Sequence, residues 1–479
     1  MQEDALRFDR LENEDCIRAY AQDFLAARRN LFLVVDDLDN TTSSLYSLRQ
    51  YQVVPVGYGT PTPDPYYWIC SNPSWYWKAD YPVCSNALGS IEAHASNWTV
   101  YGYRIRYCQS ESVDPKCRLN FNLPVLVIVI VFNAIKVVCI CFVARRMRDQ
   151  PMITLGDAVA SFLRSPDAAT KGMCLATRAH FQRSSKGLDW SQAIESPMTY
   201  KPQKMRWMRT ASIRHWVATV FVFFAALATV LGLLGYAVPR LKTSYGQSGL
   251  GSLWSLGLGQ ARSQTMITGW SIPTGGQGAL ISAILVANSP QLILSLIYVV
   301  LNSLATRLLL AREWCGFARH RKPLRVSNPQ GDQRCTYFLQ IPYRYGIPLM
   351  LCSILLHWLI SQSIYLAKVD TWSSTGIFTE PESITTCGFS PIGMMLTSIV
   401  AACLILAVFA LGLRQLGSQI PFAGSCSAAI SAACHAQGEI SETAPLKWGA
   451  VPSIELGSVG HCAFSSGEVQ EPVPGNAYA

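Results

Sequence analysis

Hydrophobic residues along the chain gather in five long stretches that polar segments separate. Each stretch has about 22 to 28 residues and almost no charge, which is the length that an α-helix needs to cross a hydrocarbon layer of ~30 Å. Lipid offers the backbone no hydrogen-bonding partner, so a crossing segment satisfies its N–H and C=O groups within a helix. We therefore predict transmembrane helices at residues 123–144, 216–238, 279–306, 346–367 and 391–413.

The composition agrees with this pattern. Half of the 479 residues are hydrophobic and 14% are charged, whereas ordinary globular proteins have about 25% charged residues. The predicted fold class is an all-α integral membrane bundle of about five transmembrane helices, with a transmembrane domain over 123–413. Residues 1–122 precede it and form a small, cysteine-containing extracytoplasmic head.

Basic residues lie on one side of the predicted helices. Segment 145–214 holds 13 Lys+Arg and 310–345 holds seven, whereas 239–278 holds three and 368–390 holds one. Lysine and arginine accumulate in the cytoplasmic loops of membrane proteins. Both basic segments are therefore expected in the cytosol.

This orientation divides the rest of the chain between the two sides. The cytosolic loops become 145–215 and 307–345, and the head is placed outside. The tail 414–479 is then cytosolic, and its Gly, Ser, Pro and Glu content predicts a largely disordered segment from about Gln437.

Two glycosylation sequons support the placement of the head. Asn40 and Asn97 each begin an Asn-x-Ser/Thr sequence within the head, whereas Pro73 excludes Asn72. The sequence therefore predicts a glycoprotein, with the plasma membrane as its location.

Cysteines in the head point to disulfides in an oxidising space. The hypothesis from spacing is that Cys70 pairs with Cys84 and Cys108 with Cys117. On this hypothesis, Cys16 pairs with Cys387 or with a cysteine of another chain.

Local patterns predict several smaller elements. Apolar spacing favours a short helix over 15–25, and 31–35 favours a strand. The aromatic groups 66–68 and 75–77 are either the core of the head or a sugar-binding surface, and the core is favoured because aliphatic residues are scarce nearby.

Two loops have patterns of their own. Thr154–Asp157 is a capping-box sequence that starts a helix running to Leu163, which we expect on the membrane surface because its apolar side chains cluster beside arginines. Loop 239–278 is rich in glycine but lacks phosphate-binding spacing, so a flexible connector is expected.

Several longer stretches together resemble a known family. The chain resembles fungal multi-pass membrane proteins that carry domain of unknown function 6536. The resemblance implies no activity, but it implies that relatives have further hydrophobic segments before the start of this chain. An N-terminally shortened member would explain why no hydrophobic segment before residue 123 delivers the head across the membrane. The stretches that carry the resemblance are Asn133–Lys136, Thr154–Asp157, Arg321–Ser327, Tyr337–Tyr345, His357–Ser363 and Gly424–His435.

Polar residues within the predicted spans are the main candidates for function. Such residues are costly in lipid and usually turn toward a partner, a cavity or a pathway. One interpretation is a polar route between the first, third and fourth spans; the other is interhelical hydrogen bonding, with Lys136 reaching toward the headgroups. The candidates are Asn133, Lys136, Asn288, Gln291, Ser295, Asn302, His357, Ser361 and Gln362.

No motif in the sequence indicates catalysis, a metal, a cofactor or nucleic-acid binding. The chain is therefore predicted not to be an enzyme. The expected partners are membrane lipids and a ligand outside the cell. Anionic lipid head groups are one candidate ligand of Arg319, Arg321, Lys322 and Arg325, and the favoured alternative is that these residues only set the topology. The predicted function is a cell-surface sensor, scaffold or structural protein; the alternative is a transporter-like or channel-like protein.

Overall fold

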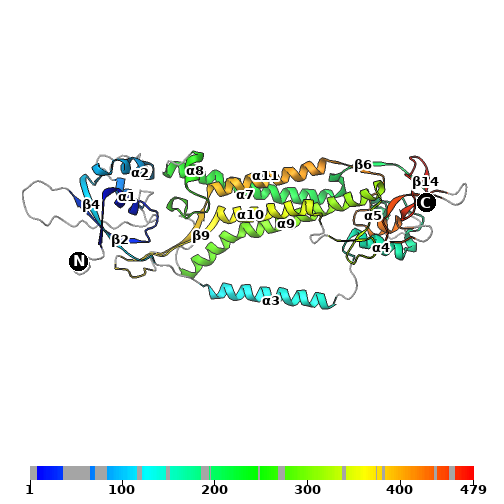
Figure 1. The fold of residues 1–479 in the computed structure, drawn as a ribbon, viewed down its shortest axis with the longest axis horizontal. Helices are drawn as coiled ribbons and strands as arrows, with labels where there is room; N and C mark the ends of the chain where they lie inside the picture. Colours follow the sequence, from blue (N-terminus) through cyan, green and yellow to red (C-terminus); the bar gives the residue numbers. More distant parts are fainter. Residues whose placement is uncertain are drawn as a thin grey trace, which may run out of the picture. The chain divides into compact units, whose positions relative to one another are not determined.

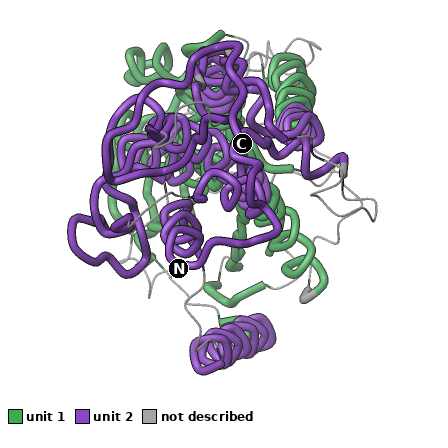
Figure 2. Tube along the Cα trace, turned by 90° about the vertical axis from the view of Figure 1, so that its right-hand side faces the viewer, with its two compact units in different colours: residues 1–122, 226–294, 355–400 green, residues 123–225, 295–354, 401–479 purple. Residues whose placement is uncertain are grey.

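The computed structural model separates into two compact units (Figure 2). Unit 1 contains 1–122, 226–294 and 355–400, and unit 2 contains 123–225, 295–354 and 401–479. Asn40, residues 75–77 and Cys117 lie outside the described residues. The structure describes residues 8–35, 65–70, 84–115, 121–146, 152–184, 194, 196–245, 249–267, 276–336, 341–373, 375–379, 383–435, 440–452 and 459–479.

Five helices are long and apolar enough to cross a membrane, as predicted, and they make this chain a membrane protein. Helix α9 extends past the predicted end at Thr306 to Arg319, because its last turns pack into a protein core that tolerates charge at its rim. Helix α10 ends at Ser363, four residues early, because the chain there enters strand β9. The five helices are α3 (Leu123–Arg146), α7 (Ile213–Tyr245), α9 (Gly276–Arg319), α10 (Tyr343–Ser363) and α11 (Pro391–Leu413) (Figure 1).

Strands occur outside the spans, so the fold there is not all-α as expected. In the head, an antiparallel sheet has the order β1-β4-β2, and β3 also pairs with β4. Helix α1 packs on β4, with Ile17 fully buried between them. The predicted helix thus exists but ends at Tyr20, and the predicted strand belongs to a longer β2. The elements are β1 (Phe8–Leu11), α1 (Asn13–Tyr20), β2 (Arg28–Val35), α2 (Cys84–Ala93), β3 (Thr99–Val100) and β4 (Tyr103–Ser112).

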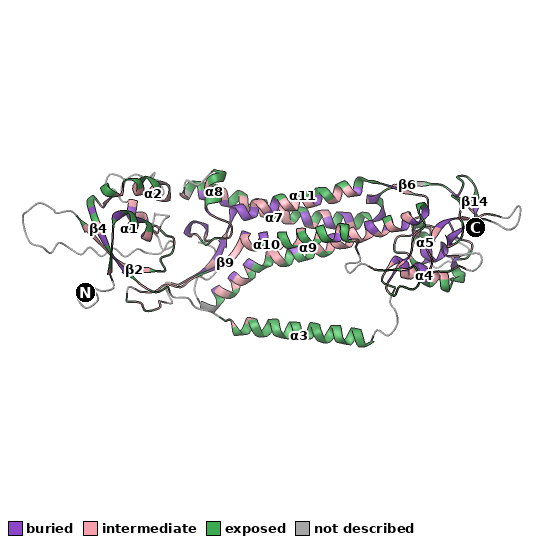
Figure 3. Ribbon diagram, viewed as in Figure 1, coloured by how far each residue is buried: buried purple, intermediate pink, exposed green. Residues whose placement is uncertain are grey.

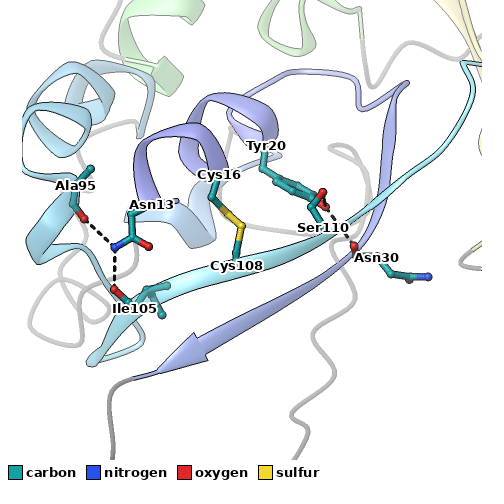
Figure 4. The surroundings of a disulfide bond; sticks show 8 residues. All are labelled: Asn13, Cys16, Tyr20, Asn30, Ala95, Ile105, Cys108 and Ser110. Atoms are coloured by element: carbon teal, nitrogen blue, oxygen red, sulfur yellow. Dashed lines mark hydrogen bonds between the residues drawn. A yellow bond between two sulfur atoms is a disulfide. The ribbon is translucent and has the colours of Figure 1, made fainter. Parts of the chain in front are cut away.

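A disulfide between Cys16 and Cys108 joins α1 to β4 (Figure 4). The predicted Cys108–Cys117 pair is therefore wrong, because Cys108 lies on the face of β4 that α1 covers. Cys387 does not bond to Cys16 either; its buried thiol donates to the carbonyl of Ala283. The Cys70–Cys84 disulfide is present as predicted.

Polar side chains reinforce the contact between α1 and β4. Asn13 donates from Nδ2 to the carbonyls of Ala95 (3.0 Å) and Ile105 (2.8 Å) (Figure 4). The Tyr20 hydroxyl lies 2.9 Å from Ser110 Oγ. Two of the three residues 66–68 also belong to the core, since Tyr66 is buried and Trp68 packs against Trp98.

The described part of loop 239–278 is ordered, contrary to the expectation of a flexible connector. It forms α8 (Leu250–Ser255), and its Ser263 hydroxyl donates to Asp23 at 2.6 Å. Arg262 makes an ion pair with the same carboxylate at 3.2 Å. Contacts with the head, rather than the local glycine content, determine the conformation of this loop. Unit 1 also contains the antiparallel pair β9 (Ile364–Val369) and β10 (Ile384–Phe389).

The tail in unit 2 is folded where the structure describes it, so the expectation of a largely disordered segment is wrong. Trp448 and Phe464 are fully buried, and Phe464 packs edge-on against Trp314 of α9 with centroids 5.4 Å apart. Large aromatic residues join many aliphatic ones in this core, and such single side chains weigh little in an average composition. The elements include β5 (Met198–Thr199), β6 (Gln203–Arg206), β11 (Gln415–Ser418), α12 (Ser427–Ala432), β12 (Lys447–Val451), β13 (His461–Ser465) and β14 (Ala477–Tyr478).

Helix α4 (Leu155–Arg164) begins with the predicted capping box at Thr154. It packs on α12 and on β7 (Arg325–Val326), with Val159 fully buried. The prediction that the apolar face of this helix lies on the membrane surface is therefore wrong. Asp157 accepts hydrogen bonds from Thr154 and from both the backbone and the hydroxyl of Ser327. Burial raises the pKa of this carboxyl, but these hydrogen bonds outweigh burial and hold it below the ordinary value.

Close backbone packing at Gly156 generates a prediction. An added Cβ would lie 2.1 Å from the carbonyl oxygen of Arg325, so Gly156→Ala should destabilise unit 2 by about 1–3 kcal/mol. The apparent Tm of the purified protein in detergent measures this effect. Gly251→Ala is the control, because open space surrounds that helical glycine and alanine favours a helix by up to about 1 kcal/mol. Equal Tm values for the two variants would contradict the packing.

Candidate functional site

The polar residues predicted in the first span do not meet partners within the described part of the protein. Asn133 and Lys136 are both exposed on α3, as is every described residue of this helix except Val125 (Figure 3). The structure therefore does not bring them together with the candidates on α9 and α10.

Most polar side chains on α9 and α10 with a described hydrogen bond bind their own helix. Asn288 donates to the carbonyl of Ile284 at 2.8 Å, and Thr306 donates to that of Asn302 at 2.8 Å. Ser361 donates to the carbonyl of Trp358 at 2.7 Å. Such bonds satisfy polar groups locally in an apolar medium and require no aqueous path.

The other candidates on these helices differ in exposure. Ser295 is exposed, and Gln291 and His357 are half-buried. Gln362 donates to its neighbour Ser361 at 3.3 Å. A buried polar contact that the sequence did not single out joins Ser363 to Thr397, whose hydroxyls lie 3.2 Å apart.

Three of the four basic residues expected to meet lipid head groups bind carbonyl oxygens of unit 2, and the Lys322 ammonium lies 6.0 Å from the centre of the Phe317 ring. Arg319 donates to Gly417 at 2.6 Å, and Arg325 donates to Cys335 at 3.1 Å. Arg321 donates to the carbonyls of Ser466 (2.5 Å) and Gly467 (2.6 Å), which places it at the end of β13. Arg319 and Arg321 thus stabilise the folded tail.

The strongest chemical cluster in unit 2 consists of Cys174, His461 and Cys462. Cys174 lies in the turn before α5 (Arg178–Ser184), and the other two residues begin β13, which pairs with β12. Cys462 and His461 are the groups that act most strongly on the pKa of Cys174. The exposed fraction is 2% for Cys174 and 0% for Cys462, so the cluster is inside the protein.

The surroundings of His461 favour its protonated form. Nδ1 faces the carbonyl of Ala479, and Nε2 faces the carbonyl of His435. An imidazole donates at both nitrogens only when it is positively charged. Burial lowers the pKa of His461, but the hydrogen bonds to Cys174 and to these carbonyls outweigh burial and raise the pKa to about 9.

Cys174 supplies the matching negative charge. The hydrogen bond from Cys462 and the contact with His461 outweigh burial and lower the pKa of Cys174 to about 5. The pKa of Cys462 is raised by the same hydrogen bond and by burial, so Cys462 keeps its proton and acts as a donor. These shifts favour a thiolate at Cys174, an imidazolium at His461 and a thiol at Cys462.

Polar groups next to the cluster position the His435 carbonyl. His435 Nε2 lies 2.9 Å from Thr170 Oγ1, which is 2.8 Å from Ser431 Oγ. Burial lowers the pKa of His435, so this second histidine is held neutral. In the residues that the structure describes, no group of three or more His, Cys, Asp or Glu side chains is placed to hold a metal ion.

Little in the sequence points to this cluster, because 288 residues separate Cys174 from Cys462. No motif spacing links them, and only the folding of the tail brings them together. The adjacent Cys434 and His435 are the more visible pattern in the sequence. Cys434 is fully buried, however, and burial raises the pKa of its thiol, so this cysteine is inert.

The fold and the site define a helical multi-pass membrane protein with folded modules outside its spans. A family model described as a domain of unknown function, DUF8419, matches residues 190–473, and the chain belongs to this family. The matched region includes four of the five apolar helices and the whole of β13. The resemblance to domain 6536 and a fungal origin remain predictions. No curated protein and no solved structure matches the chain.

The thiolate at Cys174 generates a pH prediction. Ultraviolet thiolate absorbance of wild type minus that of Cys174→Ser should titrate with a midpoint near pH 5, compared with about 8.5 for an ordinary cysteine. The thiolate signal is present above that midpoint and is lost as the pH falls through it. Cys434→Ser should retain the low-pH transition, because its thiol is held protonated. A difference midpoint near the ordinary value would contradict the ionised pair.

Proposed function

We propose that the protein is a plasma-membrane sensor or scaffold, with a glycosylated head outside the cell and a folded module in the cytosol. One observation favours this function over transport. The described polar side chains within the spans mostly bond to their own helices, as Asn288 and Ser361 do. The parts outside the spans, by contrast, have cores of their own.

The construction of the head supports a role in binding. Two disulfides and an aromatic core stabilise a sheet of few residues, which is typical of small domains in an oxidising space. Asp23 also ties the head to the loop at Arg262 and Ser263. The head is therefore a stable surface, and its ordered contact with this loop gives ligand binding a route to the membrane helices.

The module in unit 2 supports a role on the other side of the membrane. All its described cysteines are thiols, including Cys174, Cys315 and Cys462, which suits a reducing compartment. The 13 basic residues in segment 145–214 favour the same side. Its cysteine cluster is buried, and we assign it no catalytic activity.

Glycosylation tests the proposed orientation. Asn97 is exposed at the end of a short helical turn, so it is accessible to the oligosaccharyltransferase. Asn97→Gln and Asn40→Gln should each reduce the mass of the cellular protein by one glycan on a denaturing gel, and glycosidase treatment should abolish the differences. Asn72→Gln is the control, because Pro73 blocks that sequon. If neither Asn97→Gln nor Asn40→Gln alters the mass, the head is not outside.

Replacement of the charged residue within a span tests sensing against transport. Lys136→Met should restore normal function to cells that lack the gene, because the exposed ammonium lines no described polar path. An antibody fragment against the head, added to intact cells, should reproduce the phenotype of cells that lack the gene, because it covers the ligand-binding surface. The control for the variant is Cys139→Ser on the same exposed helix.

Two results would contradict the proposal. One is a Lys136→Met protein that reaches the cell surface at the normal level but does not restore function. The other is a normal phenotype when the antibody fragment saturates the head. The first of these results would favour transport instead.

A further inference from the structure

We propose that the basic junction, where the ends of four apolar helices meet in unit 2, binds the head group of an anionic phospholipid. The helices are α7 and α10 at their starts, α11 at its end and α9 just past its apolar stretch. The arginines of the junction are all exposed, and they come from four separate stretches of the chain. They are Arg206, Arg209, Arg214, Arg312, Arg344 and Arg414.

Backbone contacts join the segment before α7 to the end of α11. Strand β6, which ends at Arg206, pairs with β11, which begins directly after Arg414. The backbone N–H of Trp207 donates to the carbonyl of Arg414 at 3.0 Å. Within the helices, Trp216 packs on Phe409 with ring centroids 5.7 Å apart. The start of α7 and the end of α11 therefore lie side by side, and each brings arginines to the junction.

The side chain of Arg312 brings α9 and α10 to the same place. Its guanidinium carbon is 5.7 Å from the centre of the Trp207 ring and 5.6 Å from that of the Tyr345 ring. Its Nη1 also donates to the Tyr345 hydroxyl. The two rings hold the guanidinium group in position by cation–π attraction but leave it exposed. Arg344 is the neighbour of Tyr345 at the start of α10.

The junction lies at the depth of lipid head groups. Arg307 is the first charged residue after the apolar stretch of α9, so the hydrocarbon layer ends near it. Its Nη1 is 3.1 Å from His215 Nδ1 at the start of α7. Arg312 is five residues further along, or about 7.5 Å of helix, and the head-group layer is roughly 5–8 Å thick. Tryptophan and tyrosine, the residues that contact Arg312, are also enriched at this depth.

Positive charge in the junction has no carboxylate to balance it. The segments 201–225, 299–312, 341–354 and 401–419, which build the junction, contain no Asp or Glu. Arginines elsewhere in unit 2 differ, since Arg164 pairs with Glu442 at 3.2 Å and Arg321 donates to backbone carbonyls. A phosphate group fits the planar fork of a guanidinium with two parallel hydrogen bonds. An anionic lipid therefore supplies the missing counter-charge.

The fixed position of Arg312 distinguishes a binding site from a signal that only sets the topology. Orientation in the membrane depends on the number of basic residues near the ends of the spans, and it requires no defined place for any one side chain. Arg312, by contrast, is held by two rings and a hydroxyl from two other segments. This arrangement presents one guanidinium group in a set geometry.

The site does not depend on what the head binds. The cytosolic orientation proposed above affects only which leaflet supplies the lipid in a cell, because anionic lipids are concentrated in the cytoplasmic leaflet. A binding experiment in detergent needs no orientation. Its failure would therefore leave the proposed orientation intact, and an error in the orientation would leave the site intact.

Native mass spectrometry of the purified full chain in a nonionic detergent tests the site. The protein is titrated with phosphatidylserine or with phosphatidylcholine of the same acyl chains, and the two Kd values are compared. Wild type should bind phosphatidylserine more tightly by about tenfold or more, because each arginine near an anionic head group contributes about fivefold in Kd and several act together.

Arg312→Gln should weaken phosphatidylserine binding by about tenfold, because it removes a charge-assisted hydrogen bond, and it should leave phosphatidylcholine binding unchanged. Arg344→Gln should weaken it by about fivefold. This second variant keeps the Trp207 and Tyr345 packing intact, so it decides the matter if Arg312→Gln does not fold. Arg164→Gln is the matched control, because it removes one exposed positive charge of unit 2 outside the junction and should leave both Kd values as in wild type.

Three results would overturn the site. One is equal binding of phosphatidylserine and phosphatidylcholine by wild type. Another is a loss of phosphatidylserine binding in Arg164→Gln that equals the loss in Arg312→Gln or Arg344→Gln, since binding would then follow net charge alone. The third is inorganic phosphate that displaces phosphatidylserine at an equal concentration, which would identify a soluble anion as the ligand.

Discussion

The structure depends on one constraint, which is that a backbone in lipid must satisfy its own hydrogen bonds. Five segments meet it as helices, and these hold long runs of aliphatic residues. The parts outside the membrane fold around cores of their own, in which disulfides and aromatic side chains supplement the aliphatic residues. The head uses two disulfides and aromatic packing, and unit 2 uses Trp314, Trp448 and Phe464 around the end of α9.

Helix α9 shows how one element meets two different environments. Near its start, Ala283 and Ala287 are small and buried beside Cys387, which suits close approach of helices in lipid. After Arg307 its sequence gains charged and large aromatic residues, which suit a core with a polar rim. The helix therefore continues while its side chains change from small and apolar to charged and aromatic. No turn residue marks the helix end that we predicted at Thr306.

Features with local causes could be predicted from the sequence, and features that depend on distant partners could not. The five helices follow from length and apolarity, the capping box at Thr154 from four consecutive residues, and the Cys70–Cys84 disulfide from a separation of 14. The Cys16–Cys108 disulfide spans 92 residues, and only the packing of α1 on β4 selects it. The polar candidates lie within helices, but helical periodicity does not show which side chains meet across helices.

The prediction of a largely disordered tail is wrong for a physical reason that also explains how the cysteine cluster forms. Average composition weighs every residue equally, whereas a buried core depends on a few large side chains such as Trp448 and Phe464. Once these pack, β13 brings His461 and Cys462 against Cys174. A buried charge is stable only beside its counter-charge and with its remaining hydrogen bonds made. The imidazolium therefore needs the carbonyls of His435 and Ala479 as well as the thiolate, and each of these partners comes from a different stretch of the chain. The ionised pair can exist only when the tail is folded, so any event that neutralises the pair also removes a reason for the tail to stay in place.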